Sequence, residues 1–158
     1  MLLSNLVSKI LFSNYNINQK LYSNGSLNYA YFLTLILIFI SLPAFSQKFQ
    51  FSFTWAGLMN CTTGNPNRVQ NPEFTLKNVP KGTKWIYFKM TDLDVPMYNH
   101  GGGWAKYEGK NKIKRGQFWY QSPCPPNGSH NYQWTATASK TKNYSGTVGT
   151  AYSSKRYP

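Results

Sequence analysis

Residues 84–96 read KWIYFKMTDLDVP, and this stretch is the strongest indication of the fold class. From Trp85 onward, aromatic and β-branched side chains follow one another, which is typical of a buried strand. Two further runs alternate apolar and polar residues with a period of two, FQFSFTW at residues 49–55 and EFTLKNV at residues 73–79. Such alternation is the pattern of a strand with one buried face. We therefore predict a mostly β domain.

Two more runs extend the pattern, QFWYQ at residues 117–121 and NYQWTATA at residues 131–138. The stretches NHGGGWA (residues 99–105) and SPCPPNGS (residues 122–129) are rich in Gly and Pro, which predicts irregular structure in both. The tail, residues 144–158, is predicted to be either an edge strand or loose. Because helical periodicity is absent, we expect a sandwich or a barrel with little helix.

The first 46 residues differ in character from the rest. Residues 29–42, YAYFLTLILIFISL, form an apolar run that is short for a bilayer crossing, which needs about 20 residues. The run is typical of a signal-peptide core, and the small residues Ala44 and Ser46 predict cleavage after Ser46. An uncleaved membrane anchor is the alternative. Both interpretations predict a secreted or periplasmic location for a single domain at residues 47–158.

The charge of this predicted domain bounds its partners. The whole chain has 17 basic and 4 acidic residues, and only Lys9 and Lys20 precede residue 47, so residues 47–158 carry a net charge of +11. Such a domain is attracted to anionic surfaces, including phospholipid head groups. The densest basic cluster lacks the interleaved aromatic residues of a single-strand-binding groove, so no nucleic-acid partner is expected. This cluster consists of Lys106, Lys110, Lys112, Lys114 and Arg115.

The scarcity of carboxylates narrows the possible chemistry. With four acidic residues in the chain, a hydrolase that uses a pair of acids is disfavoured, and two cysteines with two histidines disfavour a zinc finger. Two of the four acids, Asp92 and Asp94, follow a predicted buried strand, where an unpaired carboxylate is costly. They either belong to a site or cap backbone N–H groups in a turn. Both histidines, His100 and His130, lie beside the Gly- and Pro-rich stretches.

The two cysteines are Cys61 and Cys124. The export signal and the even number of cysteines predict that they form one disulfide. Two buried free thiols are the alternative.

The order of these motifs resembles the phosphatidylethanolamine-binding protein (PEBP) family, in particular its bacterial Raf-kinase-inhibitor-like branch. The motifs are DLDVP at residues 92–96, then a histidine with a glycine cluster, then SPCPPNGSHNY at residues 122–132. Residues 61–86, CTTGNPNRVQNPEFTLKNVPKGTKWI, are similar to the segment of that branch with Cys, Asn and Pro. The resemblance covers about residues 60–140.

The resemblance implies a sandwich of two antiparallel sheets with a small pocket at one end that receives a phosphate or a phosphorylated head group. It implies a binding protein without catalytic residues, metal or cofactor. The chain departs from the family pattern in two ways: Leu93 replaces the usual proline, and the C-terminal elements, including a helix, are expected to be shortened or absent. The residues that correspond to the pocket of the family are Asp92, Pro96, His100, Pro125 or Pro126, His130 and Tyr132.

Three further expectations follow from this resemblance. The Val95–Pro96 bond is expected to be cis, as in the family. The imidazoles of His100 and His130, the Tyr132 hydroxyl and backbone N–H groups of the glycine cluster would donate hydrogen bonds to an anion. Asp92 would orient one of the histidines or bind a ligand ammonium. We therefore predict binding of a small anionic ligand or phospholipid head group, with an anionic membrane surface as a further partner.

Two other classes of function stay open. Asp92, Asp94, His100 and His130 are of the residue types that hold a divalent metal, which would suit a metal-dependent hydrolase. The chain is alternatively a cationic surface-binding or inhibitor protein that acts through its Lys-rich cluster. Metal analysis would identify the first class, and neutralising the cluster would identify the second.

Overall fold

The computed structural model describes residues 47–157. These residues form two antiparallel sheets with one short 3-10 turn, which confirms the predicted β sandwich. The predicted leader, residues 1–46, lies outside the described residues. The elements are β1 (Gln50–Phe53), β2 (Arg68–Gln70), β3 (Phe74–Lys77), β4 (Trp85–Asp92), β5 (Asn99–Lys106), β6 (Lys112–Ile113), β7 (Trp119–Gln121), β8 (His130–Ser139), η1 (Tyr144–Gly146) and β9 (Thr147–Tyr157).

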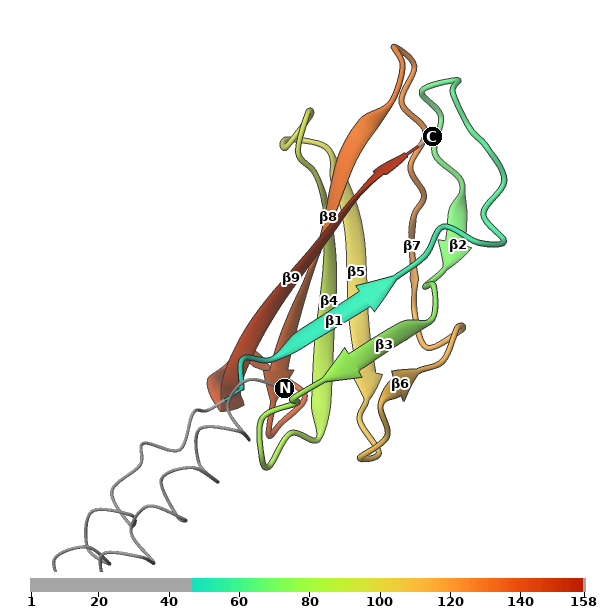
Figure 1. The fold of residues 1–158 in the computed structure, drawn as a ribbon. Coiled ribbons are helices and arrows are strands. Elements are labelled where there is room, and N and C mark those ends of the chain that lie inside the picture. Colours follow the sequence, from blue (N-terminus) through green and yellow to red (C-terminus); the bar gives the residue numbers. More distant parts are fainter. Residues whose placement is uncertain (1–46, 158) are drawn as a thin grey trace, which may run out of the picture. The chain divides into compact units, whose positions relative to one another are not determined.

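The two sheets differ in size. The smaller sheet has the strand order β1-β3-β6, and the larger has the order β2-β7-β5-β4-β8-β9. In Figure 1 the short strands of the smaller sheet cross in front of the long strands of the larger one. Within residues 47–157, no helix is long and apolar enough to span a membrane.

Strand β4 is central to the larger sheet, as its sequence predicts. It pairs with β5 on one side and with β8 on the other. Its buried residues alternate with less buried ones, so Ile86, Phe88, Met90 and Asp92 all point between the sheets. The last of these inward positions is therefore an acid, placed where the apolar core ends.

Aromatic rings fill the space between the sheets. The rings of Phe74 from β3 and Phe88 from β4 stack with centroids 4.0 Å apart, and Phe118 stacks on both. The fully buried Trp134 of β8 meets these rings edge-on. Large rings bury much area, so this cluster supplies a major part of the core from few residues.

The glycine-rich stretch is a strand, which contradicts the prediction of an irregular loop. His100 to Gly103 lie in β5, between β4 and β7. A side chain at Gly102 would meet the carbonyl oxygen of Phe88, and one at Gly103 would meet the ring of Phe118. Two of the glycines are therefore required by close packing, and the register shift in the β4–β5 pairing falls beside them.

The other sequence predictions of local structure have mixed outcomes. The five predicted strands are present as β1, β3, β4, β7 and β8, and residues 122–129 are irregular as expected. Most of the tail is an edge strand, β9, which pairs with β8 along its length. Strands β2, of three residues, and β6, of two residues, had no sequence signal of their own.

The predicted disulfide between Cys61 and Cys124 is present. It joins the segment between β1 and β2 to the proline-rich segment between β7 and β8. The hydroxyl of Thr63 lies 3.4 Å from the sulfur of Cys124. The disulfide therefore ties two irregular segments together.

Removing this disulfide should lower the free energy of unfolding markedly. A cross-link between residues 63 positions apart contributes about 4 kcal/mol in the loop-entropy model. Chemical denaturation of the Cys61→Ser/Cys124→Ser variant, compared with the oxidised protein, measures the loss. Two thiols that react with an alkylating agent in unreduced protein would show instead that the bond does not form.

The glycine at position 102 should not tolerate a side chain. In Gly102→Ala the new Cβ would overlap the Phe88 carbonyl oxygen, so the strands must move apart at an overpacking cost of about 2–3 kcal/mol. Gly109→Ala is the control, because its Cβ would meet no atom within 4 Å, although its φ of 77° is also unfavourable for alanine. In thermal denaturation, the Tm of Gly102→Ala should be clearly lower than that of Gly109→Ala. Equal Tm values would contradict the close approach of residue 102 to the Phe88 carbonyl.

Candidate functional site

The carboxylate of Asp92 organises the end of the sandwich at which β4 stops. Its Oδ1 accepts hydrogen bonds from the backbone N–H groups of Asp94 (2.9 Å) and Val95 (3.1 Å). Its Oδ2 accepts a hydrogen bond of 2.7 Å from Nδ1 of His130. Asp92 therefore caps a turn, as one of the two alternatives predicted, and also partners a histidine.

His130 is the first residue of β8 and lies near Asp92 because of strand register. Tyr132, two residues further, pairs directly with Asp92 across the sheet. Since Nδ1 of His130 donates to the carboxylate, Nε2 is the nitrogen left for another partner. The His130 side chain is 14% exposed, whereas that of Asp92 is 5% exposed. The imidazole is therefore the part of this pair that a ligand can reach.

His100 and Tyr132 complete the cluster. The two rings meet edge-on with centroids 5.4 Å apart, and the ring of Tyr132 is 6.2 Å from that of His130. His100 is buried, and its Nδ1 donates to the backbone oxygen of Gln121 at 2.9 Å. The structure thus brings together four of the predicted site residues, Asp92, His100, His130 and Tyr132.

Burial and neighbouring charges change the titration of three of these groups. Burial by itself raises the pKa of Asp92, but hydrogen bonds from His130 and from the Asp94 and Val95 backbone outweigh it and hold the pKa below its usual value. Burial lowers the pKa of His100, against the opposing effects of the Gln121 carbonyl and the Asp92 charge. Burial and the Asp92 carboxylate raise the pKa of Tyr132. Asp92 is consequently anionic near neutral pH, and His100 and Tyr132 are neutral.

The expected cis bond at Pro96 is wrong. Among the described residues every peptide bond is trans, including Val95–Pro96. The N–H of Tyr98 donates to the carbonyl of Val95 at 3.0 Å, which closes a turn with Pro96 as its second residue. A trans proline fits this turn position without strain. Pro96 itself is exposed on the turn.

Pro125 lies in the irregular segment between β7 and β8. It is buried in the segment that precedes His130, next to the bonded Cys124, whereas Pro126 is exposed. The backbone of Cys124 lies beside the Tyr132 hydroxyl. Of the two prolines that the resemblance left open, Pro125 is therefore the one whose burial fits a rigid wall.

One N–H group of the glycine cluster is already hydrogen-bonded within the protein. The N–H of Gly101 donates to Oδ1 of Asn99 at 2.9 Å. Gly102 and Gly103 pair with Lys89 and Phe88 of β4. Within the glycine cluster, the N–H of Gly101 is therefore already engaged and would have to leave Asn99 to bind an anion.

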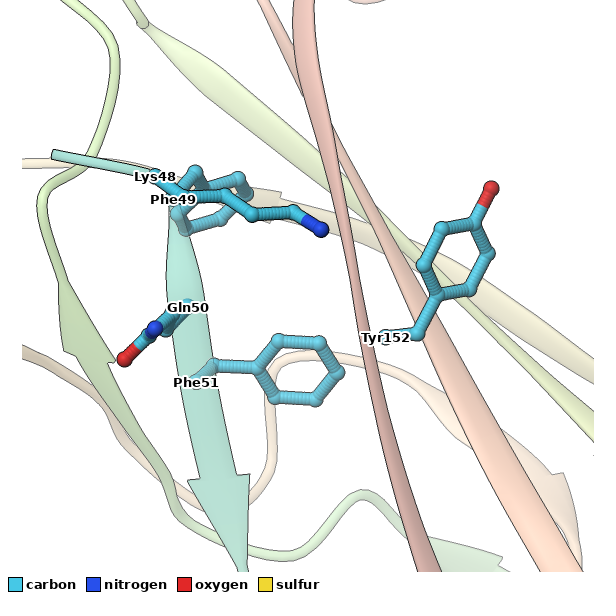
Figure 2. A pocket seen from close by; sticks show the side chains of 5 residues that line it. All are labelled: Lys48, Phe49, Gln50, Phe51 and Tyr152. Carbon is cyan, nitrogen blue, oxygen red and sulfur yellow. The ribbon is translucent and has the colours of Figure 1, made fainter. Parts of the chain in front are cut away.

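Two open cavities are present in the described part of the chain. One, of about 180 Å³, is lined by His100 but not by the other three cluster residues. The other, of about 320 Å³, lies between the start of β1 and Tyr152 of β9, and Figure 2 shows the Lys48 side chain extending toward Tyr152. The residues that line the first are Arg68, Asn99, His100, Gly101, Gly102, Trp119, Tyr120 and Gln121.

The alternative of a metal site has partial geometric support. Asp92, Asp94 and His130 each offer a ligand atom, and these atoms lie within 4.8 Å of one another. However, Nδ1 of His130 carries the hydrogen that it donates to Asp92, and Oδ2 of Asp94 accepts from the backbone of Asn131 at 2.6 Å. A metal would have to displace these hydrogen bonds.

The fold can be compared with solved structures. YbcL from Escherichia coli, described as a member of the mammalian PEBP family, aligns with a TM-score of 0.51 and 17% identity over 70% of this chain and 98% of that chain. The chain has the PEBP fold. A PEBP homologue from Chlamydia trachomatis aligns with a TM-score of 0.49 and 18% identity, covering 72% of this chain and 99% of that one.

The comparison supports the resemblance at the level of the fold. No protein-family model matches the sequence, and no curated protein matches it. The assignment to a Raf-kinase-inhibitor-like branch of the PEBP fold stays a prediction.

Sequence reasoning missed several residues around the cluster. The carbonyl of Gln121 accepts a hydrogen bond from His100. The ring centroid of Tyr98 lies 4.6 Å from that of His100, and the ring centroid of Trp55 lies 6.0 Å from that of Tyr132. Gln121 is the last residue of a predicted strand, just before the proline-rich segment. This position was the available sequence signal that Gln121 would lie near the cluster. Nothing in the sequence indicates that Trp55 would lie against Tyr132.

The lowered pKa values predict a stability that falls as the solution is acidified. His100 binds a proton less readily when folded, so its contribution is complete above the unfolded pKa of about 6.5 and is lost as the pH falls below it. Asp92 contributes in the same direction, with its loss beginning below about pH 4. Urea denaturation should show that the free energy of unfolding decreases from about pH 7 to pH 5, and that this decrease is smaller in His100→Asn than in the wild type. An equal decrease in both proteins would contradict the role of His100.

Proposed function

We propose that this protein is a PEBP-like binding protein that holds a small anionic ligand, a phosphate or a phospholipid head group, without catalysing a reaction. The observation that carries the proposal is the hydrogen bond from Nδ1 of His130 to Asp92 on a side chain that is 14% exposed, since it leaves Nε2 as the ring nitrogen that can donate to a ligand when the ring is protonated. Charge-assisted hydrogen bonds of this kind bind phosphate oxygens strongly. The proposal keeps the secreted or periplasmic location expected from the sequence.

The surroundings of His130 support an anion as the ligand. The Asp92 carboxylate is only 5% exposed and accepts hydrogen bonds from three N–H groups, so the imidazole of His130 rather than the carboxylate faces a ligand. Residues 47–158 carry a net charge of +11, which favours the approach of an anion. YbcL is described as a member of a family named for binding phosphatidylethanolamine, and its fold is shared.

Calorimetric titration with inorganic phosphate and with phosphoethanolamine tests the proposal. His130→Ala should weaken binding by about tenfold or more, since a charge-assisted hydrogen bond is worth about 1.5–3 kcal/mol. Lys106→Gln is the matched control, because it removes one exposed cation at the opposite end of β4, where Lys106 pairs with Trp85. It should bind as the wild type does.

The same experiment separates the competing functions. Absence of binding, or equal affinity of wild type and His130→Ala, would contradict the anion site. Stoichiometric uptake of Zn²⁺ without any heat from phosphate would favour the metal-dependent hydrolase. A loss in Lys106→Gln as large as that in His130→Ala would favour a general cationic surface.

A further inference from the structure

The loop between β4 and β5 is unusually apolar for an exposed segment. Four of its six residues are exposed apolar or aromatic side chains, Leu93 (45%), Val95 (45%), Met97 (96%) and Tyr98 (41%). Exposed apolar residues that occur singly need no explanation, whereas a contiguous group marks an interaction site. We call residues 93–98 the apolar loop.

The apolar loop is held in a fixed shape beside the candidate site. The Asp92 carboxylate caps the first turn of the loop by accepting from the N–H groups of Asp94 and Val95. The N–H of Leu93 donates to the backbone carbonyl of Asn131 at 2.8 Å. The turn from Val95 to Tyr98 places Met97 at its tip. The exposed apolar side chains therefore result from the fold rather than from a disordered segment.

Positive charge lies at the same end of the sandwich. Arg156 and Lys155, near the end of β9, pair with Asn131 and Tyr132 of β8. The two other acids of the described part, Glu73 and Glu108, form ion pairs with Lys112 and Lys110 at the other end. Asp94 is the one carboxylate within the apolar loop, and its Oδ2 accepts a hydrogen bond from the backbone N–H of Asn131.

We propose that the apolar loop inserts into the surface of a bilayer that contains anionic phospholipids. Apolar side chains flanked by cations are the combination that binds such surfaces. Four side chains are too few for a stable protein–protein interface, which needs about 800 Å² per partner, but they suffice for shallow insertion. The inference rests on the proposed head-group site, since the apolar loop is the part that brings His130 to the lipid phosphates.

Co-sedimentation with vesicles tests the inference. Wild-type protein should sediment with vesicles of phosphatidylcholine and phosphatidylglycerol, and the Val95→Ser/Met97→Ser variant should bind about tenfold more weakly. Tyr152→Ser is the matched control, because Tyr152 is 61% exposed on β9 outside the apolar loop. It should sediment as the wild type does. Equal binding by the loop variant, or an equal loss in Tyr152→Ser, would overturn the inference.

A second readout reports insertion directly. When Met97→Trp is mixed with these vesicles, its tryptophan fluorescence should shift to shorter wavelength and should be quenched by brominated lipid. An unchanged tryptophan fluorescence spectrum would overturn insertion and favour a protein partner. The loop variant should still bind soluble phosphate. Suppose that none of the proteins, the wild type included, binds soluble phosphate, but that Val95→Ser/Met97→Ser loses vesicle binding while Tyr152→Ser keeps it. The head-group site is then wrong, and the insertion surface stands.

Discussion

The buried carboxylate of Asp92 is the constraint on which this end of the molecule depends. A buried charge is tolerated only when it is fully hydrogen-bonded, and Asp92 has three N–H partners from two parts of the chain. It sets the first turn after β4 and the orientation of the His130 ring together. Removing one hydrogen-bond partner of a buried polar group costs about 1–3 kcal/mol, because the group loses part of what replaced its hydration. Local stability and the candidate site therefore share one residue.

A second set of contacts fixes the other side of the cluster. The hydroxyl of Tyr157, near the end of the chain, donates to the carbonyl of Met59 and accepts from the N–H of Cys61. Cys61 is bonded in turn to Cys124, whose backbone lies beside Tyr132. The segment after β1, the proline-rich segment and the last strand are thus joined around one ring. This arrangement lets irregular segments hold a defined position without regular secondary structure.

Sequence patterns predicted the strands whose side chains carry the signal and failed where the backbone carries it. The run from Trp85 predicted β4 because aromatic and β-branched side chains follow one another there, which is typical of a buried strand. Strand β5 was missed because Gly102 and Gly103 have no side chains, and their reason for being glycine, contact with Phe88 and Phe118, exists only in the folded molecule. Short strands such as β2 depend on their neighbours in the same way.

The candidate site shows the same division. Asp92, His100, His130 and Tyr132 were predicted by the resemblance and lie together, whereas the hydrogen bond from His100 to the Gln121 carbonyl involves the backbone and leaves no trace in residue type. The isomer at Pro96 was predicted wrongly, because the expectation came from the resemblance alone, whereas the turn from Val95 to Tyr98 accommodates a trans proline.

The long edge strand β9 has a consequence for how copies of the protein behave toward one another. An unprotected edge of this length is a template for edge-to-edge aggregation. Here Trp55 donates to the carbonyl of Arg156, and the ammonium of Lys155 lies 5.9 Å from the ring centroid of Phe53, so the last part of the edge is partly occupied and charged. Mutual repulsion between copies then opposes fibril-like stacking, and the basic character of the domain protects its solubility.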